Sequence, residues 1–277
     1  MKLSKYHALG NDYLVLAAED APPALGPAAV RRICDRHLGV GADGILVEQA
    51  DARVHRVRIL NPDGSEAEKS GNGLRIFARQ LWDRGRVGEE PFGVEVAGGA
   101  VVCRVAAGGR SVAVEMGHVR FDSAAIPVAG PRREVLDEVL ELEGESLRFS
   151  AASIGNPHCV ILREAVSAEE ARRLGPRIET HPLFPNRTNV QLVQLVDRAT
   201  LRLEIWERGV GYTLSSGSSS CAAAAVAHRL GRCDALVRVV MPGGTLSIEI
   251  GADYAVRMTG AVTRVAELIL DPEALEE

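Results

Sequence analysis

The sequence lacks the features that would assign it to a membrane or to a nucleic acid. No run of 18 or more apolar residues occurs, so no membrane span is expected. The first residues, MKLSKYHALGNDYLVL, contain neither an uninterrupted apolar core nor a small-residue cleavage site, so no secretory signal is expected. Basic residues are scattered, and the net charge of -5 gives no electrostatic reason to bind nucleic acid. We therefore expect a cytoplasmic protein.

Cysteine is also scarce, and its pattern argues against both a disulfide framework and a zinc site. The five cysteines are odd in number and widely spaced, which favours reduced thiols over a disulfide framework. No CxxC or HExxH pattern occurs, and the seven histidines show no ligand spacing. A zinc site is therefore not predicted.

The residues that are present describe an ordinary globular chain rich in strands. Its 277 residues, 46% apolar and 25% charged, allow two domains or one large domain with a sizeable core. More than a dozen short runs alternate apolar and polar residues with period two, as half-buried strands do. Helical spacing is found in four segments, residues 27–39, 73–85, 167–179 and 221–231.

The same helix entrance occurs twice. Ser70 and Gly71 precede one predicted helix, and Ser216 and Gly217 precede another, 146 residues later. Each entrance follows strands and precedes paired strands, which indicates an internal duplication with halves of about 1–116 and 117–262. Chance recurrence of glycine-rich turns is the alternative.

Two such entrances can bind one anion. A helix N-terminus offers unpaired backbone N–H groups and a partial positive charge. Neither entrance carries the Lys-Ser/Thr pair of a P-loop or the GxGxxG spacing, so nucleotide binding is not indicated. Together they are suited to hold one carboxylate and to stabilise negative charge developing beside it.

Polar side chains gather at the predicted strand ends near these entrances. Any one of them is explained by turn formation alone, a lone histidine is more often packed than catalytic, and an adjacent acid–base pair is often solvated. Their concentration favours a site for a small, polar, amino-acid-like ligand. The residues are Asn11, Asn61, Asn156, His158, Asn189, Glu207 and Arg208.

In order along the chain, these motifs resemble the diaminopimelate epimerase family of cofactor-independent amino-acid racemases. The resemblance is carried by KYHALGNDYLV, RHLGVGADGILV, NPDGSEAEKSGNGLR, IGNPHCV, PNRTNVQLV, WERGVGYTLSSGSSSCAAAA, MPGGTLSIEI and MTGAV. It implies an α/β fold of two pseudo-symmetric halves, each a curled, mostly antiparallel sheet around a central helix, with the ligand in the cleft between them. It also implies that the last strand, about 263–277, returns to the first half, and it suggests a homodimer.

The resemblance further implies an isomerase of lysine and cell-wall precursor biosynthesis. Family members interconvert LL- and meso-diaminopimelate, a small zwitterionic amino acid, without pyridoxal phosphate or metal. The backbones of Gly71, Asn72, Gly217 and Ser218 would hold the α-carboxylate. Asn11, Asn61, Asn156, Asn189, Glu207 and Arg208 would bind the rest of the substrate, and His158 and Glu207 would tune the two bases.

The chain departs from the family pattern at the two bases themselves. Ser70 and Ser216 occupy the positions of the two catalytic cysteines, and Tyr212 replaces a glutamate. A serine hydroxyl ionises far less readily than a thiol, so racemisation through two thiols is excluded. Three interpretations remain: an epimerase with engineered serines, a paralogue that deprotonates or eliminates on one face, and a protein that binds an amino acid without turnover.

Overall fold

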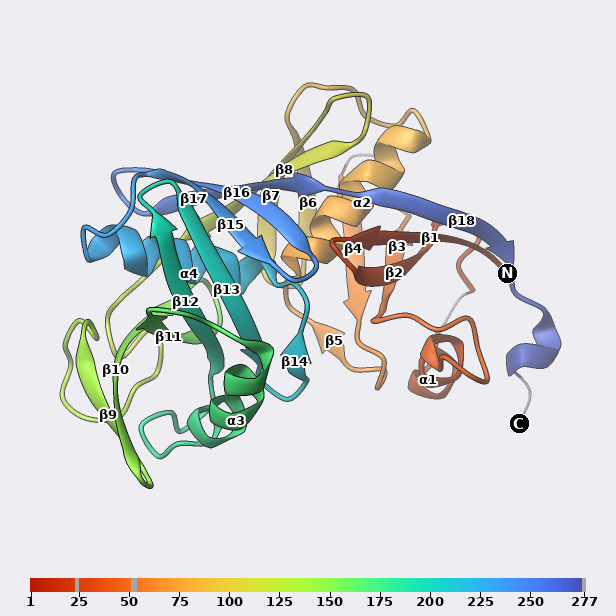
Figure 1. The fold of residues 1–277 in the computed structure, drawn as a ribbon. Coiled ribbons are helices and arrows are strands. Elements are labelled where there is room, and N and C mark those ends of the chain that lie inside the picture. The colour runs from red at the N-terminus through yellow and green to blue at the C-terminus, as the bar shows by residue number, and fades with distance from the viewer. Residues whose placement is uncertain (23–24, 51–53, 276–277) are drawn as a thin grey trace. The chain divides into compact units, whose positions relative to one another are not determined.

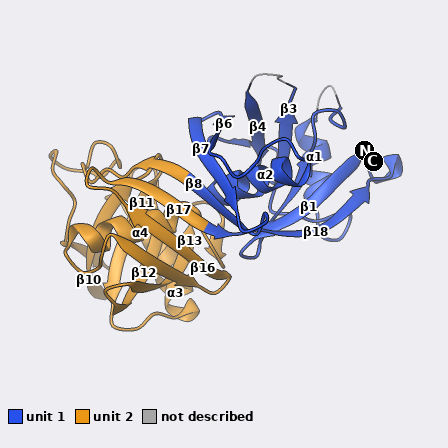
Figure 2. Cartoon of the chain, turned by 90° about the horizontal axis from the view of Figure 1, so that it is seen from above, with its two compact units in different colours: residues 1–114, 260–277 blue, residues 115–259 orange. Residues whose placement is uncertain are grey.

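The computed structural model describes residues 1–22, 25–50 and 54–275, and the chain divides into two compact units. Unit 1 comprises Met1–Val114 and Gly260–Glu277, and unit 2 comprises Glu115–Thr259 (Figure 2). The two boundaries fall inside strands β8 (Ser111–His118) and β17 (Ala255–Ala261).

Unit 1 is built on a sheet in which the last strand of the chain lies beside the first (Figure 1). The hydrogen-bonded order is β18-β1-β2-β3-β4-β6-β7-β8, with the short β5 beside the end of β4. The β2–β3 and β4–β6 pairs are parallel and the others are antiparallel. The strands are β1 (Lys2–Ala8), β2 (Asn11–Leu16), β3 (Ile45–Gln49), β4 (His55–Leu60), β5 (Glu66–Ala67), β6 (Phe92–Val96), β7 (Gly99–Ala106) and β18 (Thr263–Ile269).

Unit 2 repeats this design. Its order is β9-β10-β11-β12-β13-β15-β16, with the short β14 beside the end of β13, and β11–β12 and β13–β15 are the parallel pairs. The strands are β9 (Glu138–Leu142), β10 (Glu145–Ser153), β11 (Pro157–Arg163), β12 (Asn189–Asp197), β13 (Thr200–Glu207), β14 (Gly211–Thr213), β15 (Leu236–Met241) and β16 (Gly244–Ile250).

The helices complete the correspondence between the units. α1 (Pro27–Cys34) and α3 (Ala168–Glu179) each connect the first parallel strand pair, whereas α2 (Gly71–Asp83) and α4 (Gly217–Arg229) each follow the short strand. Both α2 and α4 have 13 residues, 146 positions apart. The expected α/β fold with two pseudo-symmetric halves is thus confirmed.

α2 and α4 are the central helices of their units. Ten residues of each are buried. α4 contacts β10, β11, β12, β13, β15 and β16, so strands far apart in the sheet order meet the same helix. The alanine run in the middle of α4 has no side chains long enough to keep those backbones apart, and all four alanines of the run are buried.

The outer helices cover separate apolar clusters. α3 packs Leu174 and Ile178 with Phe149 and Phe184, and Ser167 caps its N-terminus by accepting a hydrogen bond from Glu170 N–H at 3.1 Å. α1 starts with Pro27, whose missing N–H costs nothing at that position. None of the helices in the described part of the chain is long and apolar enough to cross a membrane.

Candidate functional site in two half-sites

In unit 1 the candidate site starts at Ser70, which caps α2. Its backbone is extended, and its Oγ accepts a hydrogen bond from Gly73 N–H at 3.1 Å. A side chain at residue 73 would approach Leu46 and Ser70 to 3.1–3.3 Å, so glycine lets the cap close tightly. The Tyr13 hydroxyl lies 3.3 Å from Ser70 Oγ. Ser70 is therefore the helix N-cap and also the hydrogen-bond partner of a phenol.

Asn72 brings a second predicted residue to this helix end. Its Nδ2 donates to Asn11 Oδ1 at 3.0 Å, and its Oδ1 accepts from the buried guanidinium of Arg75. Gly71 and Asn72 are both buried in the first turn of α2, where the helix N-terminus attracts anions. Asn11, Ser70, Gly71 and Asn72 thus form one cluster in unit 1.

Asn61 is held by its own turn. Its Nδ2 donates to Ser65 Oγ at 3.0 Å, and its backbone N–H donates to Ser65 O at 2.8 Å. Within the described residues, no hydrogen bond joins the Asn61 side chain to Asn11 or to Ser70. Its predicted role in binding substrate stays a prediction.

Ser216 caps α4 as Ser70 caps α2. Its backbone is again extended, and its Oγ accepts from Ser219 N–H at 3.4 Å. Ser216 is 3% exposed, and its carbonyl oxygen accepts from Ser220 Oγ at 2.7 Å. Gly217 and Ser218 follow in the first turn, so unit 2 repeats the Ser-Gly helix entrance of unit 1, with Ser218 and Ser219 where unit 1 has Asn72 and Gly73.

His158 reaches the first turn of α4 through a glutamine. Its Nε2 lies 2.9 Å from Asn156 Oδ1, and its Nδ1 lies 3.1 Å from Gln191 Nε2. Gln191 Nε2 also donates to Ser219 Oγ at 3.0 Å. Because an amide oxygen only accepts and an amide nitrogen only donates, the proton of the imidazole is on Nε2.

Burial keeps His158 neutral. Loss of solvent, with the positive charge of Arg208 as a smaller cause, lowers the pKa of His158 to about 3. The neutral ring uses one nitrogen to donate and the other to accept, so in this arrangement it has no lone pair left to take a proton from a hydroxyl. Its predicted role in tuning a base stays a prediction, and its observed contacts link β11, β12 and α4.

Asn189 contacts Arg208 through the backbone of the arginine. Asn189 Oδ1 accepts from Arg208 N–H, and Asn189 Nδ2 donates to Pro157 O, both at 2.9 Å. Arg208 donates from its guanidinium to Asn186 O at 3.2 Å. Glu207 is the last residue of β13 and is half-buried. Asn189 therefore holds two site segments together.

Glu179 is a site-supporting residue that the sequence did not reveal. It is 6% exposed at the end of α3, and its two oxygens accept from Gly209 N–H at 2.9 Å and from Trp206 Nε1 at 2.7 Å. Gly175 lets α3 approach this close, because a Cβ there would lie 2.3 Å from Trp206. Because Glu179 is a charged residue on a helix with many charged residues, nothing in the sequence indicated that it is buried.

The comparison with known sequences decides the family. Residues 3–121 and 150–265 match the sequence pattern of a family described as diaminopimelate epimerase. The chain belongs to the diaminopimelate epimerase family. It is 54% identical over 275 residues to "Diaminopimelate epimerase 2" of Nostoc sp., covering 99% of this chain and 96% of that protein. It is 43% identical to the diaminopimelate epimerase of Moorella thermoacetica, covering 96% of this chain and 97% of that protein.

Solved structures share the fold of this family member at low sequence identity. A hydroxyproline epimerase from Agrobacterium vitis, crystallised with trans-4-hydroxy-L-proline, aligns with a TM-score of 0.69 at 19% identity over 99% of this chain and 93% of that one. A probable proline racemase from Agrobacterium radiobacter aligns with a TM-score of 0.71 at 16% identity over 99% and 95%. At these identities the likeness shows the fold alone.

Tyr212 has a visible role in packing. Its hydroxyl donates to Glu204 Oε2 at 2.7 Å, and the guanidinium carbon of Arg172 lies 4.1 Å from the centre of its ring. Burial, followed by the hydrogen bond to Glu204, raises the pKa of Tyr212 to about 12. Tyr212 is thus a neutral phenol between α3 and β13.

None of the five cysteines lies at either of the two Ser-Gly helix entrances. All five are buried. Burial raises the pKa of Cys34 and of Cys233 to about 11 and raises that of Cys159 further, so these thiols stay protonated at neutral pH. Cys221 lies inside α4, five residues beyond Ser216. In the described residues, no three His, Cys, Asp or Glu side chains are grouped to hold a metal ion.

Proposed function

We propose that this protein is an isomerase that acts at an α-carbon of diaminopimelate and interconverts its LL and meso forms. The observation that carries the proposal is the repeated helix entrance, in which Ser70 and Ser216 cap α2 and α4 with the same geometry. Membership in the family supports the substrate. The protein acts in the cytoplasm as a homodimer and needs no pyridoxal phosphate or metal.

Substrate binding uses both helix entrances. The backbone N–H groups of Gly71, Asn72, Gly217 and Ser218 hold the α-carboxylate, and the two helix N-termini stabilise the charge that develops when the neighbouring carbon loses its proton. The remaining polar groups of the ligand bind Asn11, Asn61, Asn156, Asn189, Glu207 and Arg208.

The proton chemistry is slow because both bases are hydroxyls. Removing one well-matched acid or base typically lowers the rate by about 10²–10⁴-fold. Ser70 has the Tyr13 hydroxyl at 3.3 Å, whereas Ser216 has a neutral histidine two side chains away. A phenol is ordinarily protonated at neutral pH, and the neutral His158 ring has both nitrogens in hydrogen bonds, so neither neighbour takes the serine proton readily and both half-reactions are slow.

Binding of an amino acid without turnover is the second candidate. It is favoured by one observation: each serine Oγ already accepts a hydrogen bond from the first turn of its helix. A hydroxyl used as a cap is a poorer proton acceptor than a free one.

Exchange of the α-proton separates the two functions. The protein is incubated with LL-diaminopimelate in D2O, and the α-proton is followed by NMR while binding is measured by calorimetry. Exchange with inversion supports the isomerase, and exchange without inversion indicates a single working base. Binding without exchange supports the second candidate.

Restoring the thiols tests the site itself. The double variant Ser70→Cys/Ser216→Cys is expected to epimerise at least about 10²-fold faster than the parent chain. The matched control is Ser70→Ala/Ser216→Ala, which is expected to bind but not to exchange. Failure of both the parent and the cysteine variant to bind diaminopimelate would rule out the proposed function.

A further inference from the structure

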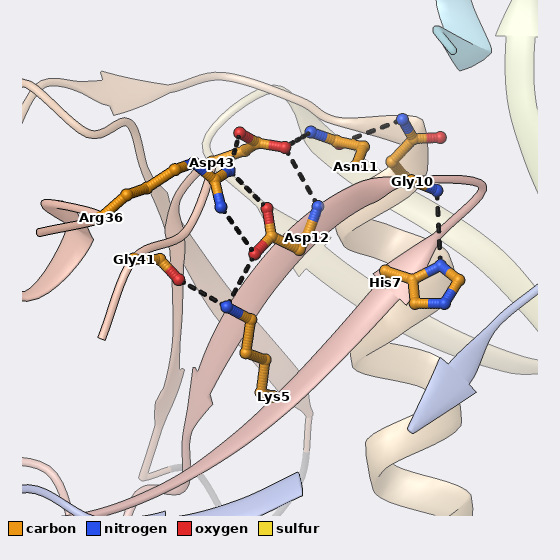
Figure 3. Close-up of polar contacts among 9 residues, drawn as sticks. Lys5, His7, Gly10, Asn11, Asp12, Arg36, Gly41 and Asp43 are labelled. Atoms are coloured by element: carbon orange, nitrogen blue, oxygen red, sulfur yellow. Dashed lines mark hydrogen bonds and ion pairs between the residues drawn. The ribbon is translucent and has the colours of Figure 1, made fainter. Parts of the chain in front are cut away.

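The amide of Asn11 is held from both sides. Its Nδ2 donates to Asp43 Oδ2 at 2.8 Å, and its Oδ1 accepts from Asn72 Nδ2 at 3.0 Å. Figure 3 shows the Asn11 amide facing the Asp43 carboxylate, which comes from the segment after α1. Asn72 Oδ1 in turn accepts from Arg75, which donates a second hydrogen bond to Ala261 O at 3.1 Å.

The two ends of this chain of hydrogen bonds fix its direction. Arg75 can only donate, so the group of Asn72 that faces it must be the oxygen. Asp43 can only accept, so the group of Asn11 that faces it must be the nitrogen. Turning either amide over would place donor against donor or acceptor against acceptor. The orientation of both amides is therefore set by one cation and one anion of the protein.

Asp43 is itself anchored by charge. Its Oδ1 accepts from Arg36 at 2.7 Å, and its Oδ2 also accepts from Asp12 N–H at 3.1 Å. Arg36 bridges to Asp12, whose other partner is Lys5 at 2.9 Å, so two cations balance two carboxylates (Figure 3). Burial opposes ionisation of Asp12, but hydrogen bonds from Arg36 and Lys5 outweigh it and hold its pKa below the usual value.

We infer that Asp43 and Arg75 are positioning residues that orient the Asn11 and Asn72 amides towards an anionic ligand. Each amide uses one N–H in the chain of hydrogen bonds and keeps a second N–H. Beside the backbone N–H groups at the start of α2, these donors suit the oxygens of a carboxylate. The inference rests on the proposed function for the identity of the ligand, but the orientation itself does not.

The orientation is tested first in the ligand-free protein. In ¹⁵N-labelled protein, the side-chain amide protons of Asn11 are expected to be shifted downfield and protected from exchange. Asp43→Asn should weaken both signatures, because a neutral amide oxygen is a poorer acceptor than a carboxylate and the new amide nitrogen would face Arg36. Glu95→Gln is the matched control, because it removes one carboxylate of an exposed ion pair with Arg56 in the same unit. Unchanged Asn11 signals in Asp43→Asn would overturn the inference.

Swapping the amide at position 11 with the carboxylate at position 43 tests the direction of the hydrogen bonds. Asn11→Asp alone places two acceptors against each other and should lower Tm, as should Asp43→Asn alone. The double variant Asn11→Asp/Asp43→Asn lets the new amide at position 43 donate to the new carboxylate, so it should recover part of that loss. A loss equal to or greater than the sum of the single losses would contradict the proposed pairing.

Calorimetry with meso-diaminopimelate connects orientation to binding. Asp43→Asn is expected to weaken binding about tenfold or more at 25 °C while staying folded, and Glu95→Gln is expected to bind as the parent does. Equal affinity of Asp43→Asn and the parent would refute the positioning role. Failure of the parent to bind would refute the proposed ligand. The orientation of the amides would still be decided by the NMR test and by the stability of the double variant Asn11→Asp/Asp43→Asn.

Discussion

The Nδ1 of His158 accepts a hydrogen bond from Gln191 at 3.1 Å, and the ring is fully buried. This pair ties the parallel strands β11 and β12 to the N-terminus of α4, because Gln191 also donates to Ser219. A neutral histidine in this place makes stability depend on pH.

The pH dependence has a definite sign. The pKa of His158 is lowered to about 3 in the folded protein, whereas the unfolded chain takes up the proton near pH 6.5. Between these values the unfolded state binds more protons, so stability falls as the pH falls, by at most about 1.4 kcal/mol per pH unit from this group. Urea unfolding of the parent and of His158→Gln from pH 7 to pH 4.5 should give a steeper loss for the parent. A protonation midpoint of His158 above pH 5 by NMR would contradict this.

Placing cysteine at the two capping positions should reduce stability. Cysteine is a weaker hydrogen-bond acceptor than serine, and loss of an N-cap costs about 0.5–2 kcal/mol. Ser70→Cys and Ser216→Cys are each expected to lower the free energy of unfolding by about that amount in urea titrations. Ser70→Thr keeps a capping hydroxyl and serves as the control. The hypothesis fails if cysteine and threonine behave alike.

Glu179 is expected to be sensitive to loss of one oxygen. In Glu179→Gln the new amide group cannot accept from both Trp206 Nε1 and Gly209 N–H, so one buried donor loses its partner. The expected cost is about 1–3 kcal/mol. Urea unfolding measures it, and the fluorescence of Trp206 reports the local change. Glu169→Gln, on the same helix, is the control and should change stability by less than about 0.5 kcal/mol.

A glutamate at position 212, the residue that the family resemblance leads one to expect there, should be unfavourable in this chain. Tyr212→Glu places a carboxylate near Glu204, so like charges repel across the β13–β14 pair. The variant should be less stable than Tyr212→Phe at pH 8. The double variant Tyr212→Glu/Glu204→Gln should recover stability by thermal unfolding. Equal stability of the two single variants would show that Glu204 does not select the residue at 212.

The sequence patterns predicted the helices and strands more completely than they predicted the polar contacts. The Ser-Gly entrances and helical spacing located α2 and α4 because caps and apolar periodicity are local signals. Residues 27–39 looked like one helix, yet α1 ends at Cys34 because the Asp35 side chain accepts from the next two free N–H groups, those of His37 and Leu38. Of the strands that the structure describes, five were not predicted: the short β5 and β14, β9, and β1 and β10, in which serine, lysine and alanine interrupt the alternation.

The supporting polar groups could not be predicted because their partners are far along the chain. Asp43 reads as part of a glycine-rich turn, and Gln191 interrupts an apolar strand without any local reason. Asp43 binds Asn11 and Gln191 binds His158, and each of these partners is more than 30 positions away along the chain. Sequence alone found the groups proposed to touch the ligand, and the structure found the groups that orient them.

The pairing of β1 with β18 affects the order in which the chain matures during translation. Unit 2 is one continuous stretch and can complete its core as soon as it leaves the ribosome. Unit 1 waits for the final strand, whose Ile269 pairs with Lys2. The half that is synthesised first is therefore the half that is finished last.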